Sequence, residues 1–272
     1  MAERDLFERL DRMIDAIVAG KAVPALEPDL AIFAVIAADL RTLPHPDFKA
    51  RLSGELFPGR KEQPMHVRPY LIVPGADDLM EFLRKTFGAE VVARYPTPDG
   101  KVMHAEVRVG DSVLEVADSG EEWPPIAAPQ HVYIDDVDAA YARAIEAGAT
   151  SLYEPVDQPY GDREAGVRDA RGIEWFIGAR LEGGPRPEGF GTVTSGFRAT
   201  GARQMLEFLE KAFGAVHVSG GMEHAEVRVG ETMIELGEAK EKWGPTRGAF
   251  HLYVADCDAT YAEALRAGGK SM

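Results

Sequence analysis

The chain has 272 residues, a length that suits about two domains, and its 45 acidic and 30 basic residues give a formal charge of −15. Hydrophobic residues make up 45% and charged residues 28%, which allows a buried core and excludes a disordered chain or a coiled coil. The negative charge disfavours nucleic acid and membrane surfaces as partners, and the single cysteine, Cys257, excludes an internal disulfide and a cysteine zinc cluster.

The N-terminus resembles no signal peptide, and no apolar run approaches the ~20 residues of a membrane span. We therefore expect a cytoplasmic protein. Residues 1–60 predict a small helical segment, with an apolar stripe that ends at Gly20 and two further helices at about 30–43 and 46–56. These helices could dock a partner or form a homodimer.

Residues 66–181 predict two cycles of the pattern βαβββ, in which an apolar strand leads into an amphipathic helix and three further strands. The first cycle has strands at 67–73, 89–95, 102–109 and 112–116 and a helix at 77–87. The second has strands at 131–134, 151–156, 165–169 and 173–177 and a helix at 137–147. A Gly/Pro-rich linker at 182–188 separates this part from the rest of the chain.

The chain contains an internal repeat. The heptapeptide HAEVRVG begins at His104 and again at His224, and HVYIDDVDAAYARAIEAGA from His131 matches HLYVADCDATYAEALRAGG from His251 at the same offset. Two copies of one unit follow, at 66–181 and 189–272. The second copy lacks a counterpart of 153–181, so we expect it to be C-terminally incomplete, either because the native chain continues beyond Met272 or because another chain supplies the strands.

One face of the predicted hairpin at 102–116 carries polar side chains. A two-residue turn at Gly110 and Asp111 sets Glu106 opposite Glu115, next to His104 on the same face. The second copy repeats this arrangement with His224, Glu226 and Glu235. Carboxylates that face each other across a ladder are unfavourable unless a cation lies between them. The face predicts either an open solvated surface or a site for a ligand or metal.

These segments together resemble the vicinal oxygen chelate superfamily, in its glyoxalase, bleomycin-resistance and PhnB-like branch. The likeness covers 67–272 and rests on PYLIVPGADDLMEFLRKTFGAE, MHAEVRVGDSVLEV, HVYIDDVDAAYARAIEAGA and DARGIEWFI. It implies an α+β fold in which two paired βαβββ modules form a half-open mixed β-barrel around one cavity, with one complete domain at 66–181 and an incomplete one at 189–272.

The resemblance also implies positions for metal ligands. Glu115 and its repeat Glu235 match a ligand glutamate, whereas the other family positions fall on Arg68, Pro129 and Phe176 in the first copy. His131 and Glu174 lie two residues from two of these positions, on the same strand face. Because only one ligand is in register, we expect no cofactor; a divalent metal (Zn, Ni, Mn or Fe) held by Glu115, His131 and Glu174 is the alternative.

Three functions stay open. The first is a binding module that holds a small, cationic ligand such as an antibiotic or natural product, and its candidate residues fall into two groups. In the first copy they are Arg68, Tyr70, His104, Glu106, Glu115, Trp123, His131, Tyr133, Glu174 and Phe176. In the second they are His224, Glu226, Glu235, Trp243 and His251. The second function is a metal-dependent lyase, isomerase or dioxygenase, and the third is a scaffold or regulatory protein that acts through its N-terminal helices.

Overall fold

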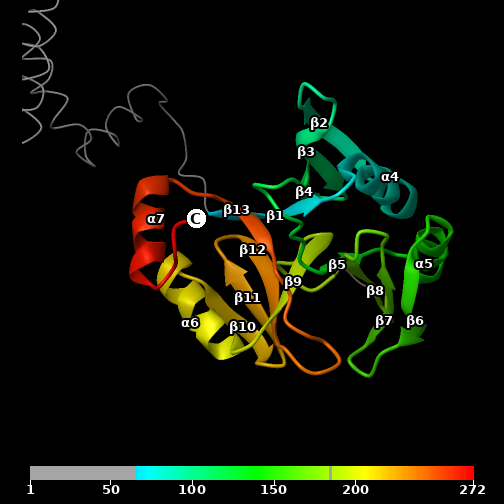
Figure 1. Ribbon diagram of the computed structural model, residues 1–272. Helices are drawn as coiled ribbons and strands as arrows, with labels where there is room; N and C mark the ends of the chain where they lie inside the picture. Colours follow the sequence, from blue (N-terminus) through cyan, green and yellow to red (C-terminus); the bar gives the residue numbers. More distant parts are fainter. Residues whose placement is uncertain (1–64, 184–185) are drawn as a thin grey trace, which may run out of the picture. The chain divides into compact units, whose positions relative to one another are not determined.

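The computed structural model describes residues 65–183 and 186–272, so the predicted helical segment at 1–60 lies outside the described residues. Four modules follow one another in the described part, and each opens with a strand that leads into a helix (Figure 1). Module 1 contains β1 (His66–Val73), α4 (Ala76–Phe87), β2 (Glu90–Pro96), β3 (Val102–Val109) and β4 (Ser112–Asp118). Module 2 contains β5 (Gln130–Tyr133), α5 (Val137–Glu146), β6 (Thr150–Asp157), β7 (Asp162–Arg168) and β8 (Glu174–Arg180).

Modules 3 and 4 repeat this order. Module 3 contains β9 (Val193–Ala199), α6 (Ala202–Phe213), β10 (Val216–Gly221), β11 (His224–Val229) and β12 (Thr232–Glu238). Module 4 contains β13 (Ala249–Tyr253) and α7 (Cys257–Arg266) within the described residues. The predicted βαβββ pattern and α+β class are confirmed. None of the described helices combines the length and apolarity that a membrane span needs.

A carboxylate from the end of the last strand caps the helix of the same module. In module 1, Asp118 accepts hydrogen bonds from the backbone N–H groups of Gly75 and Ala76, each at 3.0 Å. In module 3, Glu238 accepts the same pair of bonds from Gly201 and Ala202. A carboxylate at a helix N-terminus satisfies free N–H groups and complements the helix dipole. The two copies therefore share this stabilising helix cap as well as the order of their strands and helices.

The strands pair across the two copies. An eight-stranded sheet has the order β10-β11-β12-β9-β5-β8-β7-β6, so module 2 joins module 3 through the antiparallel pair β5 and β9. A five-stranded sheet has the order β13-β1-β4-β3-β2 and joins module 1 to module 4 through β1 and β13. Figure 1 shows β5 beside β9 and β1 beside β13.

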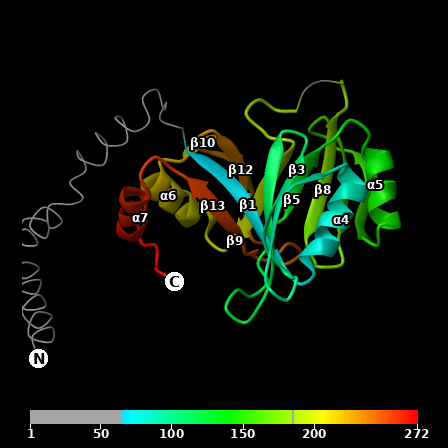
Figure 2. The same ribbon diagram turned by 90° about the horizontal axis from the view of Figure 1, so that it is seen from above.

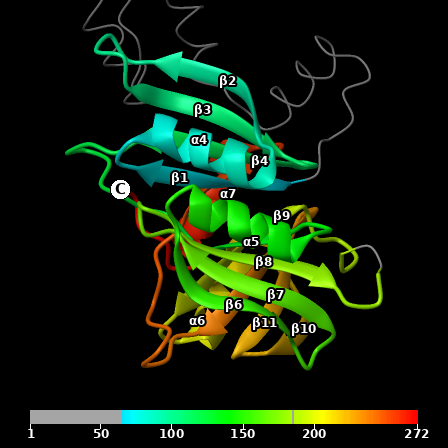
Figure 3. The same ribbon diagram turned by 90° about the vertical axis from the view of Figure 1, so that its right-hand side faces the viewer.

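This pairing corrects the expectation that the two modules of 66–181 enclose one cavity together. Within a copy the modules meet through their helices: α4 packs against α5 and α6 against α7, on two separate sides of the sheets (Figure 2). The buried Trp175 of β8 lies 6.1 Å from Phe82 and 5.5 Å from Phe87 of α4, measured between ring centroids. Because the helical layers hold each copy together, the first strand of each module keeps a free edge, which pairs with the other copy. The layers α4 over β1 to β4 and α5 over β6 to β8 are seen in Figure 3.

A buried hydrogen bond at the junction of modules 2 and 3 allows a mutational test of the pairing of β5 with β9. Ser195 of β9 donates to the side-chain oxygen of Gln130 on β5 at 2.8 Å, and both side chains are buried. Replacing Ser195 with alanine leaves that oxygen without its donor, so we expect urea unfolding to give a free energy lower by about 1–3 kcal/mol. The matched change at Ser151, which is exposed on β6, should stay within about 0.5 kcal/mol of wild type. Equal values for the two variants would contradict the pairing of β5 with β9.

Candidate ligand-binding site

A cavity of about 690 Å³ lies where modules 2 and 3 meet on one face of the eight-stranded sheet. Its size is within the roughly 300–1,000 Å³ typical of small-molecule sites. Its aromatic lining residues are Tyr133, Tyr153, Tyr160, Phe176, Phe197 and Trp243. Its carboxylates are Asp162, Glu164, Glu223, Glu226 and Glu235, and its basic groups are His131, His224, Arg180 and Arg198.

Aromatic rings form a continuous wall across the junction. The ring of Phe176 on β8 stacks with Tyr153 of β6 at 6.4 Å and meets Trp243, which follows β12, edge to face at 6.0 Å. The guanidinium of Arg198 lies 5.3 Å from the Trp243 ring. The repeat partner Trp123 is 57% exposed, so only Trp243 of the two predicted tryptophans lines this cavity.

A buried histidine and a carboxylate join modules 2 and 3 inside the cavity. His131 Nδ1 lies 3.1 Å from Glu235 Oε1, and His131 Nε2 lies 3.6 Å from Glu164 Oε2. Burial alone would lower the pKa of His131, but the charges of Glu235, Glu164 and Asp162 raise it above its usual 6.5. Burial would raise the pKa of Glu235, but the His131 charge and hydrogen bond lower it below 4.5. The two groups therefore form an ion pair near neutral pH.

Nε2 of His131 is buried and has no hydrogen-bond partner among the described residues. Buried polar atoms in proteins normally have a partner, so the N–H group at this position can donate a hydrogen bond to a molecule in the cavity.

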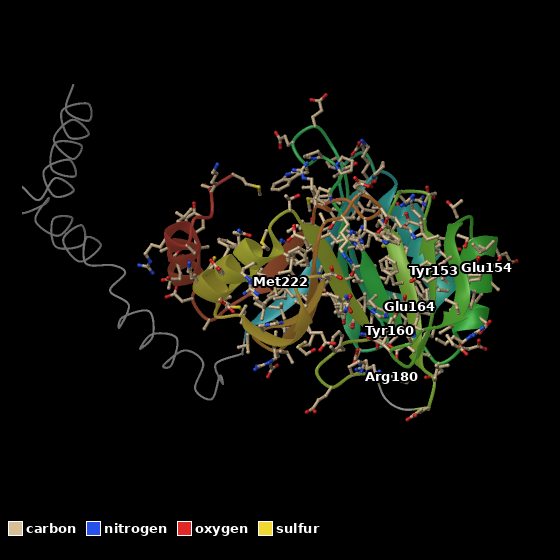
Figure 4. All side chains as sticks on the ribbon, turned by 90° about the horizontal axis from the view of Figure 1, so that it is seen from below. Tyr153, Glu154, Tyr160, Glu164, Arg180 and Met222 are labelled. Atoms are coloured by element: carbon tan, nitrogen blue, oxygen red, sulfur yellow. The ribbon has the colours of Figure 1, made fainter. Side chains whose placement is uncertain are left out.

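The module 2 side of the cavity carries phenols and a second carboxylate. Tyr153 donates a hydrogen bond to Glu164, and burial, followed by the charge of Glu164, raises the pKa of Tyr153, so its phenol stays protonated. Figure 4 shows Tyr153, Glu164 and Tyr160 close together, with Arg180 next to Tyr160. Arg180 pairs with Asp162 at 3.1 Å.

Glu174, predicted as a metal ligand, binds two arginines instead. Arg168 lies 2.8 Å and Arg198 2.7 Å from its two carboxylate oxygens. Burial would raise the pKa of Glu174, but these two hydrogen bonds lower it overall. With both oxygens used by guanidinium groups, Glu174 fixes Arg198 of module 3 to module 2 and has no position left for an ion.

The equivalent pair in the other half of the repeat is His251 with Glu115, on the five-stranded sheet. Glu115 is fully buried; it is hydrogen-bonded to His251 and accepts from Tyr253 Oη at 2.7 Å. The Arg68 guanidinium lies 3.6 Å from Glu115 and 3.3 Å from Glu106. Tyr70 lies against His251, with ring centroids 4.7 Å apart. Side chains of the protein itself thus fill this half.

The structure divides the predicted metal ligands between two sheets. Glu115 lies on the five-stranded sheet, whereas His131 and Glu174 lie on the eight-stranded one, so these three residues do not form one centre. Ligand atoms of His104, Glu106 and Glu115 do lie within 4.8 Å of one another. A divalent ion there would have to displace Arg68 from both carboxylates, and the side chains as they stand do not fit a metal centre.

Other sequence predictions can be assigned directly. The register sets Glu106 opposite Glu115 and Glu226 opposite Glu235, as the two-residue turns predict. Arg68, Tyr70, His104, Glu106, Glu115 and His251 gather on the five-stranded sheet. His131, Tyr133, Phe176, His224, Glu226, Glu235 and Trp243 gather around the cavity.

Eight polar or aromatic residues of the cavity are not among the candidates drawn from the sequence: Tyr153, Tyr160, Asp162, Glu164, Arg180, Phe197, Arg198 and Glu223. The sequence contains only a weak signal for some of these residues, in the alternation of polar residues along β7. Asp162, Glu164 and Gly166 alternate along one face of β7, and Gly166 leaves room for the Tyr153 ring, since a Cβ there would lie 2.5 Å from it. The sequence predicts that this strand begins at 165, whereas β7 begins at Asp162, so the polar first residues of β7 lie outside the predicted strand.

The ion pair of His131 predicts a pH dependence of stability. A raised histidine pKa stabilises the fold fully below pH 6.5, and this contribution is lost as pH rises through the raised value. The lowered pKa of Glu235 gives a contribution that is present above 4.5 and lost as pH falls through the lowered value. The loss of unfolding free energy in His131→Gln should therefore be greatest between these limits and shrink at alkaline pH. Urea unfolding across pH tests this, with the exposed His66→Gln as control; a loss independent of pH would contradict the pair.

Comparison with known proteins supports the fold described above. Residues 64–177 match the model of the Glyoxalase/Bleomycin resistance protein/Dioxygenase superfamily. An uncharacterized protein of Mycobacterium bovis is 34% identical over 121 residues, which cover 40% of this chain and 80% of that protein. One of Mycobacterium tuberculosis has the same identity over 71% of its length.

Among solved structures, glyoxalase I from Zea mays aligns with a TM-score of 0.56 and 16% identity, over 75% of this chain and 80% of its own. TnmS3, an antibiotic binding protein from Streptomyces, aligns over 41% of this chain and 91% of its own, with 25% identity and a TM-score of 0.34. The alignment with glyoxalase I agrees with the fold of paired βαβββ modules. By its match to the family model, the chain belongs to the Glyoxalase/Bleomycin resistance protein/Dioxygenase superfamily.

Proposed function

We propose that this protein binds a small organic cation, of the kind found among antibiotics and natural products, in the cavity between modules 2 and 3. The observation that carries the proposal is the charge of the lining: five carboxylates face two arginines and two histidines. Both arginines are already paired, Arg180 with Asp162 and Arg198 with Glu174. A ligand with a positive charge and an aromatic or apolar body would neutralise the remaining carboxylates and stack on the rings.

Calorimetric titration with three probes of similar shape tests the charge preference. Benzylguanidinium is a cation, benzylurea is neutral and phenylacetate is an anion. We expect benzylguanidinium to bind at least about tenfold more tightly than benzylurea, since one hydrogen bond to a charged group contributes about 1.5 kcal/mol or more, and phenylacetate to bind weakest. If phenylacetate binds as tightly as benzylguanidinium, the proposal is wrong.

The second candidate is a divalent-metal enzyme, since ligand atoms of His104, Glu106 and Glu115 lie within 4.8 Å of one another. It requires that the ion displace Arg68 from both carboxylates. Metal analysis after dialysis against Zn, Ni, Mn or Fe salts separates the two functions. A stoichiometric ion that disappears in Glu115→Ala would support the enzyme. Ion-free protein that binds the cationic probe would support the binding protein.

A further inference from the structure

The two halves of the repeat differ at one position on the first strand of the pairing module. Arg68 of β1 lies opposite His251 of β13, and Thr194 of β9 lies opposite His131 of β5 in the same register. Since His131 and His251 are themselves repeat partners, Thr194 stands where the other half has an arginine. Two residues further along, Gly196 stands where the other half has Tyr70, because Tyr70 pairs with Glu115 and Gly196 with Glu235.

In the half that contains modules 1 and 4, Arg68 provides the positive charge that the facing carboxylates need. Its Nη1 lies 3.3 Å from Glu106 and 3.6 Å from Glu115. Its guanidinium also lies over the Tyr253 ring, 4.7 Å from the centroid. A cation between two carboxylates removes the repulsion that the β3–β4 register creates.

In the half that contains modules 2 and 3, the same pair of carboxylates has no such cation. Glu226 and Glu235 face each other across β11 and β12, and neither forms an ion pair with an arginine or lysine of the described residues. Glu235 has His131, and one oxygen of Glu226 accepts from Ser219 at 2.6 Å. The other oxygen of Glu226 is available to a molecule in the cavity.

Two buried polar atoms at this place also lack partners among the described residues. Thr194 Oγ1 and His131 Nε2 are both without a hydrogen bond, on side chains that are more than nine-tenths buried. The two residues lie opposite each other on adjacent strands, on the sheet face that carries Gly196 and the cavity. Thr194 Oγ1 can accept a hydrogen bond from an N–H group of a cation, whereas the N–H at His131 Nε2 needs an acceptor elsewhere on the ligand, because an ammonium or guanidinium group has none.

We infer that Thr194, Glu226 and Glu235 form a cation seat, in which a primary ammonium or guanidinium group of the ligand takes the place that Arg68 fills in the other half. The inference rests on the proposed function and names the part of the ligand that the site recognises. Tyr133, whose repeat partner Tyr253 stacks under Arg68, stacks on His131 at 4.4 Å and lines the same cavity, so it offers the cation a ring face. The two halves have thus diverged into one that carries its own cation and one that accepts a cation from outside.

The test compares three variants in the full chain, with benzylguanidinium as the probe. Glu226→Gln should weaken binding about 10- to 100-fold, because it removes a charged hydrogen-bond acceptor. Glu90→Gln is the matched control: Glu90 is exposed on β2 of the five-stranded sheet and is paired with Arg108 at 3.7 Å, so its change should weaken binding less than about fivefold. Thr194→Arg should abolish detectable binding and raise Tm by about 2–4 °C, since the new guanidinium would neutralise Glu226 and Glu235.

The outcomes separate the seat from the proposed function. If the probe binds the wild-type chain and Glu226→Gln weakens it no more than Glu90→Gln does, the seat is wrong and the binding function stands. If the probe does not bind the wild-type chain, both are wrong. Should Thr194→Arg not fold, the comparison of Glu226→Gln with Glu90→Gln decides alone.

Discussion

Gly196→Tyr should abolish binding of benzylguanidinium, with an affinity at least about 100-fold lower, equivalent to about 2.7 kcal/mol. The reason is the repeat. Gly196 lines the cavity between modules 2 and 3, whereas its counterpart Tyr70 places a ring against His251 in the other half. A tyrosine at 196 would place its ring against His131 and occupy the space of the ligand. Calorimetric titration measures the loss, and circular dichroism checks that the fold is kept.

Gly196→Ala is the matched control for that variant. A Cβ at this position would lie 3.3 Å from Oε2 of Glu235, a contact that a shift of the side chain by a few tenths of an ångström relieves. We therefore expect the alanine variant to keep binding within about threefold, or about 0.7 kcal/mol. If tyrosine leaves the affinity unchanged, the ligand does not occupy this cavity.

Glu115→Ala should lower the free energy of unfolding by about 3 kcal/mol. Removing one partner of a buried charged network costs about 3–5 kcal/mol, and the lower end applies because Arg68 and His251 keep access to water. Chemical denaturation measures the change. The ligand affinity should remain close to wild type, since Glu115 lies on the five-stranded sheet and the cavity on the eight-stranded one.

The matched control is Glu106→Ala on the facing strand. Glu106 has 30% of its side chain exposed and only a 3.3 Å contact with Arg68, so we expect a loss of less than about 1 kcal/mol. A Glu115 variant as stable as wild type would mean that the carboxylate has a role other than holding the five-stranded sheet together. Loss of a bound metal ion on the same change would point to the second candidate function.

Local features of the fold could be predicted because they depend on short stretches of chain. The alternation of β3 and β4 and the two-residue turn at Gly110 set Glu106 opposite Glu115, and the structure has that register. Because the sequence repeats, the same prediction applies to Glu226 and Glu235, and it is confirmed. Both are consequences of strand periodicity, which is visible in the residues themselves.

The partner of each first strand could not be predicted in the same way. Whether β5 pairs with β1 or with β9 depends on how modules 1 and 2 pack, through contacts such as Phe87 of α4 with Trp175 of β8 that join residues far apart in sequence. The expectation that modules 1 and 2 enclose one cavity also gave a wrong set of metal ligands. Glu115 and His131 were placed in one metal centre, whereas each lies opposite the repeat partner of the other, as Glu115 with His251 and Glu235 with His131.

The sequence contains the difference between Arg68 and Thr194, which occupy matching positions in the two copies. Its meaning required the structure, because only the pairing of β1 with β13 and of β5 with β9 shows that the two residues occupy equivalent places beside equivalent carboxylates. A duplicated unit allows this kind of divergence, in which one copy keeps a stabilising arginine and the other gains space. Under the proposed function, the ligand binds in the half where Thr194 and Gly196 replace the arginine and tyrosine of the other half.

A crystal structure of the full chain with bound benzylguanidinium is the most direct test of ligand binding by modules 2 and 3. We expect one probe in the cavity, with its guanidinium within hydrogen-bond distance of Glu226 and Glu235 and its ring against Phe176 or Trp243. A probe on the five-stranded sheet beside Glu115, or a metal ion between His104, Glu106 and Glu115 with this cavity free of the probe, would contradict it.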